Sequence, residues 1–185
     1  PNPFCQLKKI GLLDLAYNKI KTTPAWGKDI APLQLYLDHN ELESLPVDEQ
    51  GYFCGYEDIE NFSVTFNKLK KFPNIFSAQS QFTMKSVDFS GNDITGFEGE
   101  EDGTYRGLKV ETFTLAQNPK LTKYPTAIAK SNSTVAYIIL RACNIDEIPK
   151  GSFEYENSIY MTSIDLSYNK LKELPWEMHA VNLPY

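Results

Sequence analysis

The chain has 185 residues, of which 42% are hydrophobic and 23% charged, a composition typical of a folded protein. No run approaches the roughly 18 apolar residues that a membrane helix needs, so we expect no membrane-spanning segment. The chain carries 18 Lys plus Arg against 24 Asp plus Glu, a net charge of -6, and has no dense basic cluster. This balance argues against a nucleic-acid partner.

Seven related phrases follow one another along the chain. They occupy residues 10–20, 32–42, 59–69, 84–94, 110–121, 135–145 and 161–171, the fifth with one residue inserted. The ninth place of the phrase is Asn in six copies and Cys in the sixth, namely at Asn18, Asn40, Asn67, Asn92, Asn118, Cys143 and Asn169. Successive spacings are 22, 27, 25, 26, 25 and 26 residues, so the period predicts a stacked repeat architecture.

Each phrase predicts a short strand. Its fourth and sixth places are apolar, as in Leu13 and Leu15 or Phe62 and Val64, and this alternation buries one face of a strand. A strand of two or three residues cannot bury that face alone, so we expect neighbouring coils to stack with parallel strands. The side chain at the ninth place is then expected to serve backbone groups of the turn that follows, as a structural ladder.

A second element follows each phrase except the fourth, and it is an apolar residue or Thr before Pro, as in Leu45-Pro46 and Phe72-Pro73. Proline disfavours helix in the residue before it, so extended or short helical connections are expected between the strands. The fourth copy instead carries the acidic stretch 98–103. We interpret this stretch as a solvated loop, because it lacks the alternating oxygen ligands of a calcium site.

The phrases resemble the leucine-rich repeat template L-x-x-L-x-L-x-x-N/C-x-L over essentially the whole chain. The low Arg content, abundant Lys and Tyr and long irregular repeats are similar in style to bacterial cell-surface proteins of the Bacteroidetes type. The resemblance implies an α/β solenoid of about seven repeats. It would be a curved, horseshoe-shaped array with a parallel sheet on the concave face and irregular or short helical convex connections. Residues 1–185 would form a single domain, and partial repeats at both ends suggest a fragment of a longer array.

The outward third, fifth, seventh and eighth places of the phrases form the predicted binding face. Bulky or charged side chains bracket small residues in the middle coils, and aromatic and Arg residues are frequent anchors in interfaces. The candidate partner-binding residues are Tyr36, Asp38, His39, Phe66, Tyr137, Ile139 and Arg141. We assign Asp14, Asp88, Asp165, Tyr17 and Tyr168 to the scaffold, because repeated positions usually report packing.

Enzymatic readings find little support. The chain lacks a phosphate-binding loop, a nucleophile elbow and a zinc-binding helix, and has only two histidines, His39 and His179. The three cysteines, Cys5, Cys54 and Cys143, form neither a metal pattern nor a disulfide framework, and whether they are free stays open. No catalytic residue, metal site or cofactor is therefore predicted.

The expected function is recognition of a protein, with a glycan as the other ligand class, through the concave face. The alternative is a rigid spacer or stalk that displays other domains of a larger protein. An extracellular or cell-surface location follows from the resemblance, and a cytoplasmic one stays open.

Overall fold

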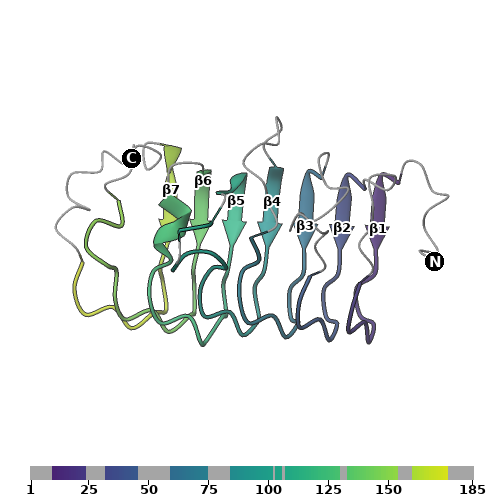
Figure 1. Cartoon of the computed structure of the whole chain (residues 1–185), viewed down its shortest axis with the longest axis horizontal. Helices are drawn as coiled ribbons and strands as arrows, with labels where there is room; N and C mark the ends of the chain where they lie inside the picture. Colours follow the sequence, from purple (N-terminus) through teal and green to yellow (C-terminus); the bar gives the residue numbers. More distant parts are fainter. Residues whose placement is uncertain are drawn as a thin grey trace.

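The computed structural model describes residues 10–23, 32–45, 59–74, 84–101, 103–105, 107–129, 133–153 and 160–174. Seven strands form one parallel sheet in chain order, and each strand pairs with the next (Figure 1). The strands are β1 (Leu12–Asp14), β2 (Gln34–Tyr36), β3 (Asn61–Ser63), β4 (Met84–Asp88), β5 (Lys109–Thr114), β6 (Thr134–Ile139) and β7 (Ser163–Asp165). The predicted parallel sheet and solenoid are therefore confirmed. We call the segment that contains each strand a coil and number it by its strand.

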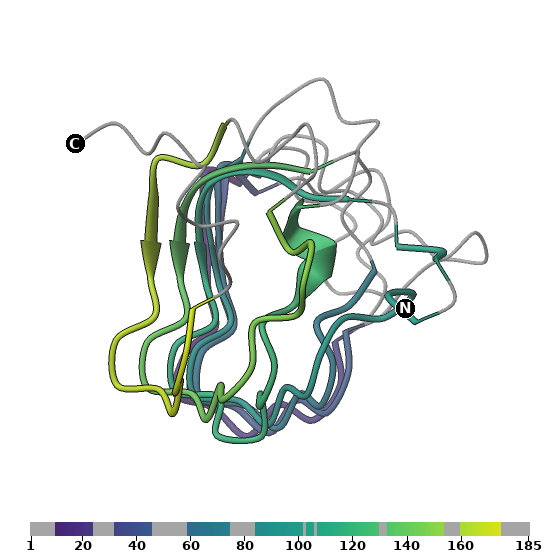
Figure 2. The same ribbon diagram turned by 90° about the vertical axis from the view of Figure 1, so that its left-hand side faces the viewer.

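The register aligns equivalent places of the phrases across all seven strands. Leu13 pairs with Leu35, Leu35 with Phe62, and Phe62 with Val87, and the series continues through Phe113 and Ile138 to Ile164. Apolar side chains therefore stack in rows along the array. Viewed along the array, the strands form one wall and the returning connections form the other (Figure 2).

The strands in the middle of the array are longer than the sequence indicates. β4 has five residues and β5 and β6 have six each, because pairing begins earlier, for example at Lys109 with Thr134. Just before β5, the buried Leu108 donates its backbone N–H to the hydroxyl of Ser133 in the next coil, at 3.0 Å. This contact extends the alignment of the two coils ahead of the template phrase.

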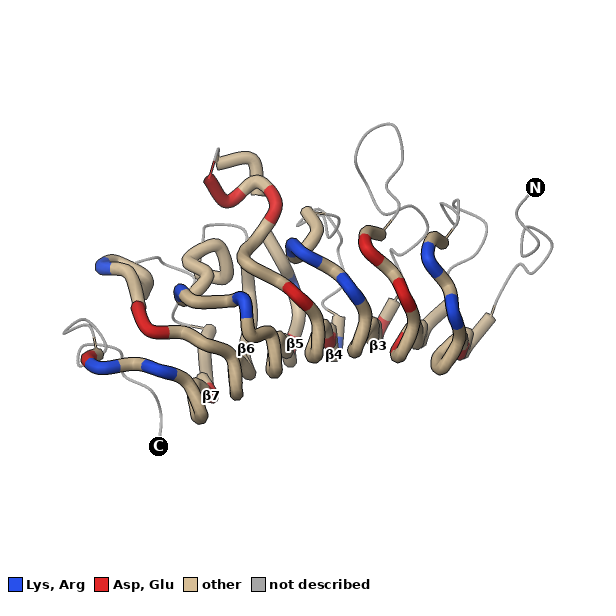
Figure 3. Tube along the Cα trace, turned by 90° about the horizontal axis from the view of Figure 1, so that it is seen from below, with Lys and Arg blue, Asp and Glu red and all other residues tan. Residues whose placement is uncertain are grey.

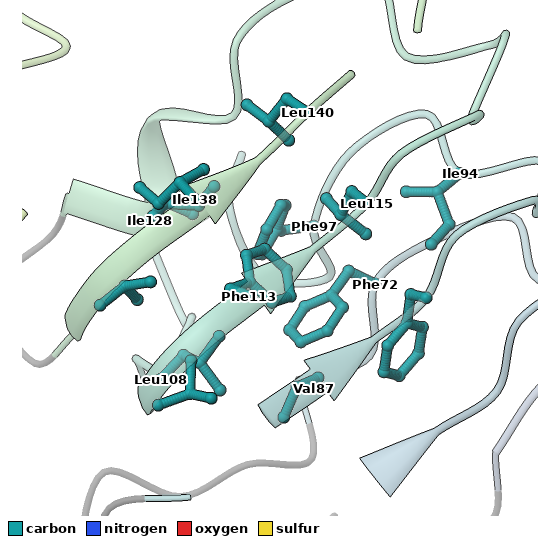
Figure 4. Packing of buried hydrophobic residues seen from close by; sticks show 14 of the residues in the cluster. Phe72, Val87, Ile94, Phe97, Leu108, Phe113, Leu115, Ile128, Ile138 and Leu140 are labelled. Carbon is teal, nitrogen blue, oxygen red and sulfur yellow. The ribbon is translucent and has the colours of Figure 1, made fainter. Parts of the chain in front are cut away.

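The core lies between the sheet and the connections. The inward fourth and sixth places are fully buried in the middle coils, as for Val87 and Leu115, and half-buried in the first and last coils. Phe72, which precedes a proline, lies at the centre of an aromatic cluster: its ring centroid is 4.8 Å from that of Phe89 and 5.0 Å from that of Phe113 (Figure 4). Rings from three successive coils thus interlock, so the coils cannot slide past one another without losing these contacts.

The connections are extended or irregular over most of their described residues. The helical element that the structure describes in full is the 3-10 helix η1 (Thr126–Ala129), which follows Pro125. Glu100, from the acidic stretch of coil 4, accepts hydrogen bonds from the Thr126 hydroxyl and the Ala127 N–H, both at 3.0 Å. Part of the acidic stretch therefore caps a helix of the next coil, because its carboxylate satisfies an N–H that the helix start leaves unpaired.

The ladder residues join each turn to the turn of the preceding coil. Asn118 is fully buried, and its amide donates to the carbonyls of Phe89 at 3.1 Å and Leu115 at 2.8 Å. Its oxygen accepts the backbone N–H of Ile94 at 3.0 Å. The corresponding bonds recur at Asn40, Asn67, Asn92 and Asn169. At Asn18, in the first coil, the amide donates to the two carbonyls of its own turn.

Cys143 departs from this pattern in step with the inserted residue of coil 5. Burial raises the pKa of its thiol, which stays protonated and donates to the Leu115 carbonyl at 3.2 Å. A thiol offers the preceding coil only a weak acceptor in place of the amide oxygen. In that coil the insertion at Pro119 lets the N–H of Leu121 bond the carbonyl of Asn118, at 3.0 Å, within its own turn. Because the Leu121 N–H is already bonded in its own turn, it does not need the amide oxygen that asparagine would supply in place of Cys143.

Charges alternate from coil to coil along the lower edge of the array, where the chain turns away from each strand (Figure 3). Basic residues follow the odd strands and acidic residues follow the even ones: Lys19 and Lys21, Glu41 and Glu43, Lys68 and Lys70, Asp93, Lys120 and Lys123, Asp146 and Glu147, Lys170 and Lys172. The five ion pairs of the described residues all join adjacent coils, as Lys68 to Glu41 at 3.2 Å and Lys120 to Asp93 at 3.0 Å. Exposed pairs contribute about 0 to 1 kcal/mol each to the free energy of unfolding. The alternating charges therefore favour the correct pairing of adjacent coils more than they stabilise the fold.

Candidate binding face

We call the outward third, fifth, seventh and eighth places of the seven phrases the strand face. The strand register brings the third places into one row, from Leu12 through Gln34, Asn61, Ser86, Thr112 and Tyr137 to Ser163. The fifth places form a second row, from Asp14 through Tyr36, Ser63, Asp88, Thr114 and Ile139 to Asp165. Of the candidate residues, Tyr36, Tyr137 and Ile139 therefore lie in rows that neighbouring coils share.

The eighth place is in the left-handed backbone region in all seven coils. The residues are Tyr17, His39, Phe66, Gly91, Gln117, Ala142 and Tyr168, with φ between 51° and 69°. This region favours Gly and Asn and is unfavourable for bulky side chains. Four of the seven coils nevertheless carry a ring here. These rings therefore occupy backbone positions that glycine would adopt with less strain.

Three of these rings form a continuous stack, which we call the aromatic column. The ring centroids of Tyr17 and His39 are 4.3 Å apart and those of His39 and Phe66 are 4.6 Å apart, with planes within 14° of parallel. The column ends at Gly91, where a Cβ atom would lie 2.6 Å from the Phe66 ring. Tyr17 is 77% exposed and Phe66 45% exposed, so the column offers ring edges to solvent along the first three coils.

A second exposed cluster lies at the other end of the sheet. The guanidinium of Arg141 lies 4.3 Å from the ring centroid of Tyr168, a cation–π contact that joins coils 6 and 7. Tyr137 and Ile139 lie on β6, on the same coil as Arg141, and Tyr137 is 41% exposed. The structure describes every position of the strand face, and Arg141 is the one Lys or Arg among them.

The aspartates of the strand face are used within the chain. The carboxylates of Asp14, Asp88 and Asp165 each accept the backbone N–H two residues later, at 2.9 Å. Coil 3 has Ser63 where those coils have Asp, and Asp38 of coil 2 takes over the role. Its carboxylate accepts the N–H of Thr65 at 2.7 Å and hydrogen bonds from the hydroxyls of Ser63 and Thr65.

The face between the two clusters carries mainly small, polar side chains. Coils 3 to 5 present Ser, Thr, Asn, Asp, Ala and Gly there, apart from Phe66 and Gln117 at the eighth places. Several of these side chains bond one another, as the Ser86 hydroxyl does with the Asn61 amide oxygen at 2.8 Å. The exposed large apolar side chains of the face thus lie on coils 1 to 3 and on coils 6 and 7.

The structure divides the seven candidate residues into two groups. His39 and Phe66 lie in the aromatic column, with Tyr36 and Asp38 on the same coils, whereas Tyr137, Ile139 and Arg141 lie together on β6 and its turn. Sequence reasoning left out Tyr17 and Tyr168, which it assigned to the scaffold. Both rings contact a candidate residue of the adjacent coil, and their shared eighth place could have indicated this.

The described residues show neither a metal cluster nor a membrane helix. Within the described ranges no group of three or more His, Cys, Asp or Glu side chains could hold a metal ion. No helix in the same ranges is long and apolar enough to cross a membrane. The His39 ring is held between two aromatic rings rather than against a nucleophile.

Comparison with solved structures finds the same architecture in two bacterial proteins. A leucine-rich repeat protein from Bacteroides eggerthii superposes with a TM-score of 0.84 at 34% identity, covering 98% of this chain and 30% of that one. A leucine-rich repeat protein from Bacteroides thetaiotaomicron has a TM-score of 0.79 at 34% identity, covering 98% of this chain and 22% of that one. The resemblance to leucine-rich repeat proteins, and to those of Bacteroides, is confirmed.

Curated sequences give a more distant match. Lumican from Bos taurus is 25% identical over 175 residues, or 93% of this chain, and human lumican is also 25% identical over 175 residues. The chain spans about half the length of these relatives, 46% and 47%. No protein-family model matches the chain.

Proposed function

We propose that this chain is a non-catalytic binding module that recognises a protein partner through the strand face of its leucine-rich repeat solenoid. The observation that carries the proposal is where the exposed apolar side chains lie. Among the described residues eight large hydrophobic side chains are exposed, and five of them are at outward places of the phrases: Leu12, Tyr17, Phe66, Tyr137 and Tyr168. Scattered exposure is normal, but exposed rings gathered on one face favour an interface.

The anchors of this interface are the two clusters at the ends of the face. Tyr and Arg are the residues most often found at the energetic centre of interfaces, and the C-terminal cluster combines Tyr137, Ile139 and Arg141 with Tyr168. The stacking of Arg141 on Tyr168 restricts the guanidinium before a partner arrives. Less conformational entropy is then lost on binding.

The competing proposal is a rigid spacer or stalk. The polar middle of the face favours it, because the side chains of Asp38, Ser63 and Thr65 already satisfy one another. Under either proposal the chain acts without catalysis, cofactor or metal, and an extracellular or cell-surface location suits it. Curvature of the array would place the strand face on the concave side, where a glycan is the other ligand class.

The two proposals differ in the effect of the double variant Tyr137→Ala, Arg141→Ala. A pull-down from host and microbial surface extracts with the unaltered chain should retain a partner that the double variant loses. The matched control is Tyr160→Ala, Lys150→Ala, which removes an exposed ring and a cation away from the strand face.

All three proteins should melt at closely similar temperatures, since none of the four side chains is buried. Retention by the unaltered chain and the control alone supports recognition through coil 6. Equal retention by all three, or by none, favours the spacer.

A further inference from the structure

The strand face of coils 1 to 4 is charged with one sign. Its outward places carry the carboxylates of Asp14, Asp38 and Asp88 and no Lys or Arg. The lysines of the first and third coils lie instead on the lower edge, where Lys68 pairs with Glu41 (Figure 3). The exposed Lys85 of β4 pairs with Glu60 at 2.6 Å. Within the part of the chain that the structure describes, the carboxylates at these outward places are therefore in no ion pair, and this half of the face is negative.

Two of these carboxylates lie close together at its centre. The Asp38 carboxylate reaches over coil 3 to the Ser63 hydroxyl, and Ser63 is the register partner of Asp88 on β4. Adjacent parallel strands are about 4.8 Å apart, so the carboxylates of Asp38 and Asp88 are separated by about one inter-strand spacing. Among the ion pairs of the described residues none involves either aspartate.

The proximity of Asp38 adds a small electrostatic cost at Asp88 to the larger cost of burial. Burial raises the pKa of its carboxyl, and the charge of Asp38 acts in the same direction against hydrogen bonds from Ser90. Hydroxyl and amide donors hold both carboxylates in place but bring no positive charge. A cation arriving from outside would relieve the repulsion without rearranging the site.

The aromatic column adjoins one of these carboxylates, that of Asp38. Asp38 directly precedes His39, and the rings of Tyr17 and Phe66 flank His39 at stacking distance. Lys and Arg have aliphatic stems that pack on apolar surface while their charged ends reach polar groups. Ring edges beside carboxylates suit such a side chain better than they suit an acidic or a purely apolar one.

We propose that this surface, formed by Asp14, Asp38, Asp88 and the aromatic column, docks a basic segment of the protein partner. A Lys or Arg of that segment places its charge at Asp38 and Asp88, and its apolar neighbours pack on the column. This inference rests on the proposed function and names the chemistry of the partner. Because Arg141 provides the positive charge of the other end, the partner is oriented with its basic part over coils 1 to 4.

The test uses two labelled peptides of equal length, one alternating lysine with leucine and the other alternating glutamate with leucine. Fluorescence anisotropy measures their binding to the whole chain at low and at high NaCl concentration. The lysine peptide should bind, the glutamate peptide should not, and added salt should weaken the binding because exposed charges are screened.

The deciding variant is Asp38→Asn, Asp88→Asn, which removes both charges but keeps an oxygen to accept the bonds from Thr65 and Ser90. Its charge-matched control is Glu43→Gln, Asp146→Asn, on the lower edge. The first variant should weaken binding of the lysine peptide about tenfold or more, as expected for close charge pairs, and the control should leave it within about twofold.

Equal binding of the two peptides, binding of neither, or equal loss in the two variants would overturn the inference. The pull-down at Tyr137 and Arg141 does not depend on this result. A partner that still requires coil 6 while the lysine peptide fails would leave the proposed function standing and remove only the basic segment.

Discussion

Replacing Asn118 by Ala should destabilise the chain far more than the same replacement at Asn18, although both residues hold the same place in the phrase. Asn118 is fully buried between two coils, whereas Asn18 is exposed and, among the described residues, its amide bonds carbonyls of its own turn alone. Comparing the two variants distinguishes the stability that comes from ladder contacts between coils from the stability that comes from having asparagine in the turn. Each variant serves as the control for the other.

The magnitude follows from what each group loses. Without Asn118 the N–H of Ile94 loses its acceptor in the core, which costs about 1 to 3 kcal/mol. The carbonyls of Phe89 and Leu115 keep other donors, Asn92 and Cys143, so losing the Asn118 amide there adds only about 1 kcal/mol. The total is about 2 to 4 kcal/mol, against about 1 kcal/mol or less for Asn18→Ala in water.

Urea denaturation followed by circular dichroism measures both free energies of unfolding. The slope of each transition should be unchanged, because neither variant alters the surface exposed on unfolding. Asn118→Cys should lie close to Asn118→Ala, since a thiol still donates but leaves Ile94 without a good acceptor. Equal losses at Asn18 and Asn118 would refute the account of the ladder as a bond between coils.

Three further outcomes are expected. Leu115→Ala should cost about 2 to 5 kcal/mol in the same urea assay as a buried truncation, whereas the outward Thr114→Ala should cost little, and equal costs would contradict the strand register. Gly91→Ala should destabilise the chain by about 1 kcal/mol or more and displace the Phe66 ring, seen as altered aromatic shifts in NMR spectra, because its Cβ has no space there and its φ is 69°. Asp88→Asn should stabilise the chain at neutral pH, because the raised pKa of Asp88 means that folding opposes its charge; this gain should shrink as pH falls through that pKa, and a constant gain would argue against a charge effect.

Much of the fold could be predicted from local pattern. Alternation at period two assigns Leu35 and Phe62 to the core and Tyr36 and Ser63 to the strand face, and the structure pairs them in that register. The recurrence of the phrase also predicts that all strands are parallel. These features follow from each coil separately, because the period of side chains along a strand is a property of the backbone.

The candidate site depended more on contacts between coils. Asp38 stands at an outward place, yet it reaches the N–H of Thr65, 27 residues away, because Ser63 leaves that group without a carboxylate of its own. Likewise the contact of the Tyr168 ring with Arg141 of the preceding coil cannot be predicted from either phrase alone. No short window of sequence contains either pair.

The coupling of Cys143 to Pro119 shows the division between local pattern and tertiary structure most clearly. The template marks each as a separate irregularity, one a substitution and the other an insertion, with nothing to connect them. Only the stacked coils show that the insertion redirects the Leu121 N–H to Asn118 and so removes the need for an oxygen at Cys143. Periodicity determines which way each side chain points, because that depends on the backbone alone. Which groups satisfy one another across coils depends on how neighbouring turns meet in space.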